Sequence, residues 1–507
     1  MFNFLLSDAA RLANAVTIGE GRVTDERYIV NEINQFKLSK RRKGMLDGEK
    51  YYAGLHDILL RKRTVIGEGG KLEEVDNLPN NRIVDNQYKK MVDQKNNYIL
   101  GQPISVQCKN ERYSKLLKQV FNKRFQRLMK SVGEDSLNCG IGWLFVYYDE
   151  HGEITFKKLK PFEVIPLWSD SEHTKLDGAI RIYEVVWYDG KTEEVIEKVE
   201  VYAEEGIYYF ELSGGSLKPD APFFQNYFTI TDEGGNETGY NWTKIPLIPW
   251  KYNNKEIPLI RMVKTLQDGL NTIESNFQNA MEEDVRNTIL VLVNYDGQNL
   301  AEFRKNLAQY GAVKVKTVDG AGGDLKTLQI EVNSENYKAI LELFKKAIIE
   351  NAMGYDAKDD RLAGNPNQMN IQSMYSDIDL DAKNMETEFQ ASFEELLWFI
   401  NCHFANTGLG DFEGEDVEII FNKDILISEG EVIDNVNKSQ DLSLETRLAM
   451  HPWVDDVRTE LDRIEKEKEK NMEQYGLAFN PAVGSGGEGG SEGQDDKKVP
   501  DEEETDD

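Results

Sequence analysis

The sequence predicts an α+β protein that is mostly helical, and three observations support this fold class. Apolar residues recur at helical spacing in stretches between residues 24 and 136. Segments rich in aromatic and β-branched residues, separated by turns, follow between residues 143 and 212. From residue 258 to residue 474 the pattern returns to helices, one of which carries a single long apolar stripe. Helices, an antiparallel sheet and a second helical region are therefore expected in this order.

Length and charge limit the possible functions. The chain has 507 residues, 40% of them hydrophobic, which is enough for a sizeable core and about two to four domains. Its 60 basic and 90 acidic residues give a net charge of -30, so a monomer repels polyanions at long range, which argues against tight sequence-specific DNA binding. Cys108, Cys139 and Cys402 lie far apart without a CxxC pair, as expected of buried thiols in a reducing compartment. No basic leader and no apolar run of roughly 20 residues is found, so neither a signal peptide nor a membrane partner is expected.

The first half of the chain is expected to form a mixed domain. Its helices are predicted at residues 24–53, with Thr24 as the N-terminal cap, and at residues 82–100 and 111–136. Its strands are predicted at residues 143–148, 153–159, 179–188, 194–203 and 207–212. Helices thus lead into an antiparallel sheet.

One long helix is expected from Pro258, a residue that suits the first helical turn, to residue 288. Apolar residues recur along it at steps of three and four, namely at Val263, Leu266, Leu270, Ile273 and Phe277. At about 1.5 Å per residue such a helix is a rod of about 45 Å. Its single stripe predicts that one face packs on a partner.

A compact β-α-β-β unit is expected after this helix. Its strands are predicted at residues 289–295, 313–318 and 325–332, and its helix at residues 300–310. A second helix begins at residue 334 and places Tyr337, Leu341 and Phe344 on one face. Paired helices would bring the ends of the insertion together and carry it as a knob on a stalk.

The rest of the chain is predicted to be a polar loop at residues 355–367, a long helix to about residue 404 and a helical segment at residues 428–474 that contains a capped start at Ser443. From residue 481 onward ten acids and two lysines give a net charge of -8. This tail is too polar to bury a core of its own.

Signals for nucleotide binding are weak. Gly190, Lys191 and Thr192 imitate the end of a phosphate-binding loop, but Val185 occupies the position of the required earlier glycine. A tight turn between two strands explains these residues better.

Signals for a metal site are weak as well. Asp377, Asp379, Asp381 and Glu388 match four positions of a calcium loop, yet Ala382 stands where the sharp turn needs glycine. The segment also has a helical pattern, so an acidic helix face, solvated or facing a lumen, is the preferred interpretation. The five histidines are scattered and no GxSxG motif occurs. We expect no catalytic residue, no metal and no cofactor, and hence an assembly or binding protein rather than an enzyme.

Three stretches carry a resemblance to a known family. They are YYAGLHDILLRKR from Tyr51, NRIVDNQYKKMVDQKNNYILGQPISV from Asn81 and SLETRLAMHPWVDDVRTELDRIEKEKE from Ser443. In this order they resemble the portal (head-to-tail connector) proteins of siphovirus-type tailed double-stranded DNA phages, and the likeness extends from about residue 24 to residue 474.

The resemblance implies a portal-type fold with four named parts, the wing, stem, clip and crown, in a ring that typically has twelve copies around an axial channel. On this plan the chain divides into a flexible N-terminus (1–23), the wing (24–256), stem helix one (257–288), the clip (289–333), stem helix two (334–352), the tunnel loop (353–367), a long wing helix with the following strand (368–427), the helical crown (428–477) and a disordered acidic tail (478–507). The apolar stripes of the two rods then become the stem packing.

The resemblance also implies partners and a location. Double-stranded DNA would pass non-specifically through the channel, the terminase large subunit would dock on the clip during packaging, and head completion or adaptor proteins would replace it. Major capsid and scaffold proteins would surround the ring at one capsid vertex of the virion, after assembly in the host cytoplasm.

The tunnel loop would hold the groups nearest to passing DNA. Its polar residues Lys358, Arg361, Asn365 and Gln368 are the predicted contacts, because a few short polar groups at a constriction can grip a duplex without stalling it. Twelve copies at -30 each carry roughly -360 charges, so an acidic channel wall would repel phosphates and let DNA slide.

Two other classes of protein stay open at this stage. A head-tail adaptor or scaffold-like protein would form an assembly without conducting DNA. A packaging nuclease or ATPase would need a phosphate loop or a carboxylate metal cluster, which the sequence does not offer.

Overall fold

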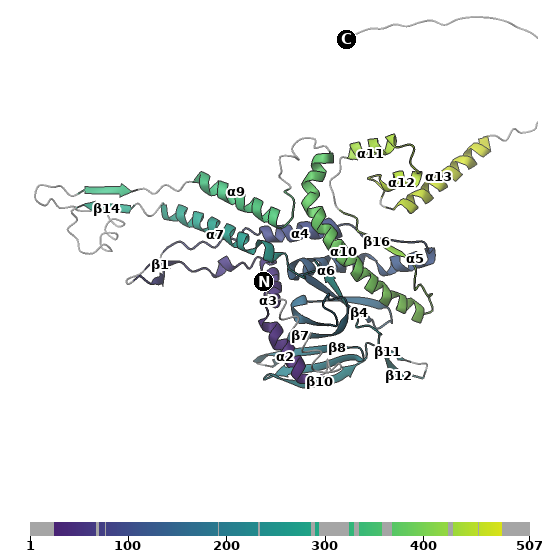
Figure 1. Ribbon diagram of the computed structural model, residues 1–507, viewed down its shortest axis with the longest axis horizontal. Coiled ribbons are helices and arrows are strands. Elements are labelled where there is room, and N and C mark those ends of the chain that lie inside the picture. Colours follow the sequence, from purple (N-terminus) through teal and green to yellow (C-terminus); the bar gives the residue numbers. More distant parts are fainter. Residues whose placement is uncertain are drawn as a thin grey trace, which may run out of the picture. The chain divides into compact units, whose positions relative to one another are not determined.

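The computed structural model describes residues 25–66, 70–76, 78–190, 192–231, 234–284, 289–293, 324–328, 334–356, 368–423, 429–454 and 456–478. The chain divides into two compact units, Met1–Leu426 and Ile427–Asp507. The larger unit mixes helices with antiparallel sheets and the smaller one is helical in its described part (Figure 1). The mixed fold class expected from the sequence is therefore confirmed.

Two N-terminal helices stand where one was predicted. They are α2 (Glu26–Leu38) and α3 (Lys40–Tyr52). Asp25 caps α2 by accepting from the Arg27 N–H at 2.9 Å, so the prediction of Thr24 as the cap was wrong. The helix ends at Ser39, whose backbone is extended and whose hydroxyl accepts from the Arg42 N–H at 3.0 Å to start α3. A serine that can bond nearby backbone favours such a break.

A short 3-10 helix, η1 (Asp57–Leu60), and a hairpin of β1 (Thr64–Ile66) and β2 (Leu72–Glu74) come next, and none of them was predicted. The following helix, α4 (Gln87–Leu100), begins five residues later than the predicted residue 82. Asn86 caps it, with its side chain accepting from the Lys89 N–H at 2.9 Å. Residues 81–86 form neither helix nor strand instead, and we call them the strap.

The third predicted helix is also divided. It forms α5 (Glu111–Val120) and α6 (Lys123–Cys139), because Asn122 leaves the helical conformation and caps α6 through the Arg124 N–H at 2.9 Å. Before α5, strand β3 (Ser105–Cys108) pairs with β16 (Val417–Ile420), so the far end of this unit returns to its beginning.

Two antiparallel sheets form the middle of the large unit. In the three-stranded sheet, β4 (Ile141–Tyr148) lies between β13 (Leu247–Lys251) and β5 (Ile154–Leu159). The five-stranded sheet has the order β10-β9-β8-β7-β6, and its strands are β6 (Val164–Trp168), β7 (Leu176–Asp189), β8 (Thr192–Ala203), β9 (Gly206–Ser213) and β10 (Ser216–Gln225). A small hairpin of β11 (Phe228–Thr231) and β12 (Glu237–Tyr240) follows. Strands β6, β10, β11, β12 and β13 were missed from the sequence.

The turn between β7 and β8 accounts for the glycine that imitated a phosphate loop. Gly190 has a φ of +63°, and Asp189 pairs with Thr192 across the turn. A glycine accepts this left-handed conformation at little cost. The interpretation as a tight turn is correct.

Long helices follow the sheets. They are α7 (Ile260–Asp284), α9 (Ser334–Asn351) and α10 (Gln368–Asn406), and a strand pair of β14 (Ile289–Val293) and β15 (Asp324–Leu328) lies between the first two in the chain. The predicted helix at residues 300–310 and strand at residues 313–318 lie outside the described residues.

The core of the large unit lies where α6 and α10 meet the three-stranded sheet. The Phe393 ring of α10 is 4.8 Å from Trp250 of β13 and 6.3 Å from Phe125 of α6, measured between ring centroids. Trp250 and Trp143 are fully buried. Such aromatic contacts bury large areas and fix α10 on the sheet.

The smaller unit contains α11 (Glu429–Lys438), α12 (Leu444–Ala449) and α13 (Val457–Ala478). Ser443 caps α12, as predicted, by accepting from the Thr446 N–H at 3.2 Å. Of the helices described in the whole chain, none is both long and apolar enough to cross a bilayer.

Candidate functional site: the helix pair and the loop base

Helices α7 and α9 pack side by side through their apolar stripes (Figure 1). Val263 and Leu270 are fully buried, and the Phe277 and Tyr337 rings approach to 4.8 Å across the pair. Gly269 permits close contact, because a Cβ atom there would lie 2.5 Å from the Phe344 ring. The other predicted stripe residues, Leu266, Ile273 and Leu341, are half-buried.

A second face of α7 is buried although it is polar. Gln267, Asn271, Ser275 and Asn279 follow one another at steps of four residues, and each is at most 1% exposed. Four buried polar side chains on one helix face need hydrogen-bond partners, because an unpaired buried polar group is costly.

The partners are backbone amides of the strap and of the first turn of α4. Asn279, Ser275, Asn271 and Gln267 accept, in this order, from the N–H groups of Asn81 (2.7 Å), Ile83 (3.0 Å), Asp85 (3.1 Å) and Tyr88 (3.0 Å). Four residues of helix rise about 6.0 Å and two residues of extended chain about 6.6 Å, so the two repeats match from Asn81 to Asp85. The last step, from Asp85 to Tyr88, takes three residues because the chain enters α4 there. We call these contacts the amide ladder.

The amide ladder is continued by side chains on both sides of it. Asn271 donates to His56 Nδ1 at 2.7 Å, and His56 Nε2 donates to the Tyr51 carbonyl at 3.1 Å. Burial lowers the pKa of His56, so the ring is neutral and both of its nitrogens are paired.

An ion pair joins the strap to α9. The Lys345 ammonium lies 2.6 Å from Asp85 and 3.7 Å from Glu274 of α7. Burial by itself would raise the pKa of Asp85, but the hydrogen bonds from Lys345, Gln87 and Glu274 and the charge of Lys345 together lower it. The strap thus contacts both helices of the pair.

The chain that leaves α9 is held by α4. Gln94 accepts from the Tyr355 N–H at 3.0 Å and donates to the Tyr355 carbonyl at 2.8 Å. Lys95 donates to the Met353 carbonyl at 3.1 Å. Gly354 permits this close approach, because a Cβ atom would lie 2.7 Å from Met91 Sδ and 2.8 Å from Gln94 Oε1 and both side chains would have to shift. The segment just before residue 357 is therefore fixed in place.

Helix α10 follows residues 357–367 and is held by α4 as well. Its Tyr375 ring lies 4.5 Å from Tyr355 and 5.9 Å from Tyr98 of α4. Lys95, which is almost fully buried, pairs with Asp381 of α10 at 2.6 Å, and the Tyr252 hydroxyl donates to the same carboxylate at 2.8 Å. Helix α4 thus binds the chain on both sides of residues 357–367, and we call this group of contacts the loop base.

The predicted DNA-contacting residues fall largely beyond these contacts. Lys358, Arg361 and Asn365 lie outside the described residues, and Gln368 is the first residue of α10. Their role stays a prediction.

The acidic residues that imitated a calcium loop lie on α10. Asp379 pairs with Lys383 and Lys423, each at 2.8 Å, and Asp381 pairs with Lys95. At Asp379 and Asp381 the acidic face is thus an internal ion-pair network. In the part of the chain that the structure describes, no cluster of three or more His, Cys, Asp or Glu side chains could hold a metal ion.

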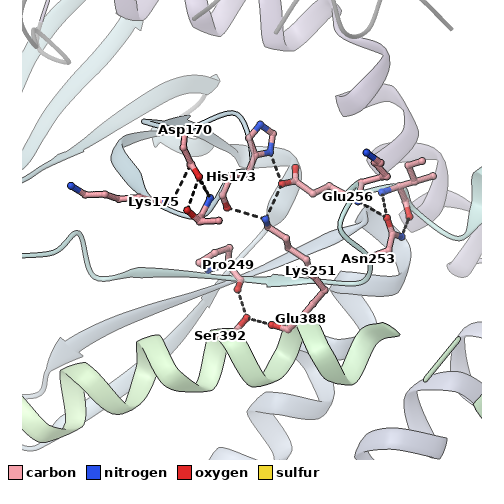
Figure 2. Close-up of polar contacts among 12 residues, drawn as sticks. Asp170, His173, Lys175, Pro249, Lys251, Asn253, Glu256, Glu388 and Ser392 are labelled. Carbon is pink, nitrogen blue, oxygen red and sulfur yellow. Dashed lines mark hydrogen bonds and ion pairs between the residues drawn. The ribbon is translucent and has the colours of Figure 1, made fainter. Parts of the chain in front are cut away.

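A buried charge cluster holds the root of α7 (Figure 2). The Glu256 carboxylate lies 2.5 Å from Arg41, 2.7 Å from His173 Nδ1 and 3.7 Å from Lys251. Burial would raise its pKa, but these cationic and hydrogen-bonding neighbours, Arg41 above all, hold it at about 2. Figure 2 also shows Ser392 of α10 donating to the Pro249 carbonyl, at 2.6 Å, on the strand that carries Lys251.

Comparison with known proteins now decides the family. A model of the family "Phage portal protein, SPP1 Gp6-like" matches residues 37–474. The chain belongs to this phage portal protein family. The portal protein of Bacillus phage SPP1 is 27% identical over 440 residues, which cover 85% of each chain. The portal protein of Clostridium phage phiCD119 is 27% identical over 442 residues, which cover 85% of this chain and 93% of the relative.

Similar solved structures are more distant. A chain in the neck of an empty GTA particle, computed with C6 symmetry, is 13% identical, with a TM-score of 0.38 over 76% of this chain and 95% of that one. A chain in the neck of a native GTA particle, computed with C12 symmetry, is 11% identical, with the same TM-score over 71% and 88%.

The family assignment confirms the resemblance seen in the sequence. The protein is a phage portal or connector component of the virion and has a structural role, so the alternative of a packaging nuclease or ATPase is rejected. The amide ladder and the loop base were missed from the sequence. Only the four-residue repeat of polar residues along α7 could have revealed the ladder.

Proposed function

We propose that this portal protein forms a closed ring, of twelve copies, at one capsid vertex, and that the ring encloses the channel for genome packaging and ejection. The observation that carries the proposal is the helix pair α7 and α9, with the strand pair β14 and β15 between them in the chain. Two rods packed along one face and held at their root form a stalk, and a ring of such stalks encloses a tube.

The parts of the chain take the roles that the family resemblance implies. Residues 24–256 and 368–427 are the wing, residues 257–288 and 334–352 the two stem helices, residues 289–333 the clip and residues 428–477 the crown. The contacts of α7 with α9, and the division between Leu426 and Ile427, support these boundaries. The assigned N-terminus (1–23) lies outside the described residues, and so does the acidic tail (478–507) apart from Ala478, the last residue of α13.

The partners follow from the same assignment. The clip docks the terminase large subunit during packaging and head completion or adaptor proteins afterwards. Major capsid and scaffold proteins contact the ring during its assembly in the host cytoplasm.

The tunnel loop, residues 353–367, brings the protein to the DNA. Gln94 and Lys95 hold the beginning of this loop, and Tyr375 and Asp381 lie on the helix that follows it, so α4 anchors the chain on both sides of the loop. Lys358, Arg361, Asn365 and Gln368 contact the duplex there. The strap binds stem helix α7, and α4 binds the start of the loop. Because the strap runs directly into α4, a movement of the stem can be passed to the loop.

Mass measurement and electron-microscope images of the purified chain test the proposal. Closed rings with an open centre are expected, and a monomer under every assembly condition would refute it. The loop is tested by reversing Lys358 and Arg361 to glutamate, with the exposed Lys338 of α9 reversed as a matched control. We expect DNA packaging to fall in the loop variant alone, and normal packaging would remove these residues from the channel.

A further inference from the structure

The large unit carries a strongly basic surface on an acidic protein. Residues 109–130 contain eight basic side chains and one acid, a net charge of +7 in a chain of net charge -30. The eight, all exposed, are Lys109, Arg112, Lys115, Lys118, Lys123, Arg124, Arg127 and Lys130. Of these, Lys115, Lys123, Arg127 and Lys130 make no ion pair with any other described residue. We call this surface of α5 and α6 the basic face.

A hollow of mixed character lies beside the basic face. It has a volume of about 280 Å³, and Leu116, Val120 and Leu128 contribute apolar side chains to its lining. Arg124 lines it as well, together with two acids of the β4–β5 turn region, Asp149 and Glu153. The surface therefore offers positive charge next to exposed apolar atoms.

Strands β7 and β8 of the five-stranded sheet extend beyond their neighbours as an arm whose charge is opposite to that of the basic face. Strand β6 pairs with β7 only up to Arg181, and β9 pairs with β8 only from Glu197 onward. Beyond these points residues 185–189 pair only with residues 192–196, as far as the structure describes them. A two-stranded ribbon of this kind is marginally stable in water.

This arm exposes large apolar side chains on both of its faces. Trp187 is 52% exposed and Tyr188 is 67% exposed, and Val185, Val186 and Val195 are exposed as well. The register places Tyr188 opposite Glu193 and Trp187 opposite Glu194. Residues 184–197 contain five acids and one lysine, a net charge of -4. The arm is thus acidic and apolar, which is the complement of the basic face and its hollow.

A ring needs two different complementary surfaces on each subunit, because a head-to-tail contact joins unlike patches. Subunits with a charge of -30 repel each other unless basic and acidic surfaces are separated and meet across the contact. We infer that the arm of one subunit packs on the basic face of the next copy, with its aromatic tip against the apolar side chains of the hollow. This inference rests on the proposed ring.

Charge reversal and its rescue test the contact. The arm variant is Glu193→Lys with Glu194→Lys, the face variant is Lys123→Glu with Arg127→Glu, and a third protein combines all four changes. Each pair alone should raise the subunit concentration needed for rings at least tenfold, and the combined protein should return close to the wild type. Glu237→Lys with Tyr240→Ala, on exposed β12, is the matched control and should assemble normally. Unchanged melting temperatures show that the variants fold.

A cysteine pair tests the contact without changing charge. In a Cys402→Ser background, which leaves the buried Cys108 and Cys139, Trp187→Cys with Arg124→Cys should give a ladder of covalently joined subunits, and either cysteine alone should not.

Three results would overturn the inference: rings of both single-pair variants at wild-type concentration, failure of the combined protein to recover, or no ladder. If the face variant forms normal rings that no longer bind duplex DNA, the basic face binds DNA and not the next subunit. If the wild type forms no rings, the proposed function itself fails, and this outcome is distinct from the others.

Discussion

Replacing Asn271 by leucine should break the hydrogen bond to the Asp85 N–H and leave the other three bonds of the amide ladder intact. Asn271 accepts from the Asp85 N–H at 3.1 Å and from Gln267 Nε2 at 3.0 Å, and it donates to His56 Nδ1 at 2.7 Å. Leucine has a similar volume but no polar atom, so these groups stay buried and lose their partner. A buried unpaired amide costs about 1–3 kcal/mol.

Hydrogen exchange read by mass spectrometry measures this cost at single amides. A loss of about 1–3 kcal/mol corresponds to roughly 5- to 150-fold faster exchange at Asp85, since about 1.4 kcal/mol is a factor of ten. Ser275→Ala is the matched control, because Ser275 holds only the Ile83 amide at 3.0 Å and should accelerate exchange there. The reasoning fails if the Asp85 amide exchanges at the wild-type rate. It also fails if both variants accelerate both amides equally, because the strap would then open as one unit.

Three further predictions concern stability, each read by thermal melting. Lys95→Met should destabilise the large unit by about 3–5 kcal/mol, because Asp381 would be left as an unpaired buried charge, while Lys95→Met with Asp381→Leu should recover most of that loss. A double variant as unstable as the single one would contradict this reasoning. Since the folded pKa of Glu256 is about 2, below the ordinary 4.5, its contribution is present above pH 4.5 and should disappear as the pH falls from 4.5 towards 2. Glu256→Gln should flatten that part of the pH profile, and an unchanged profile would exclude Glu256 as its source. Gly269→Val should lower the melting temperature by forcing α7 away from α9, and Phe344→Leu should partly restore it; a neutral Gly269→Val would show that the pair has room.

The apolar pattern was enough to predict the helix pair. Val263 and Leu270 are buried at the predicted spacing, and Phe277 meets Tyr337. Large apolar side chains at helical steps have few alternatives to packing on a partner, so this part of the fold follows from local sequence. The Ser443 cap was predictable for the same reason, since its contact is three residues away.

The breaks between helices were not predictable from periodicity. Ser39 and Asn122 lie inside stretches that keep a helical pattern, yet each turns its side chain onto a nearby amide and starts a new helix. Such a choice depends on small differences between two local hydrogen bonds, which apolar spacing does not record.

The strap shows how distant contacts override a helical pattern. Residues 82–86 were assigned to a helix, but the amides of Ile83 and Asp85 are satisfied by side chains about 190 residues later in the chain. A polar stripe on a helix normally faces water, so Asn271 and its neighbours predict exposure when they are considered alone. Only the folded arrangement shows that they are buried.

The four-residue repeat of the amide ladder also limits how α7 can travel. A slide of the helix along its axis by less than one turn, about 5.4 Å, would strip the acceptors from all four amides together. Helix α7 and the strap beside it therefore have a fixed axial register. Force applied along α7 is therefore passed to the strap and α4, and any smooth bending has to occur outside residues 267–279.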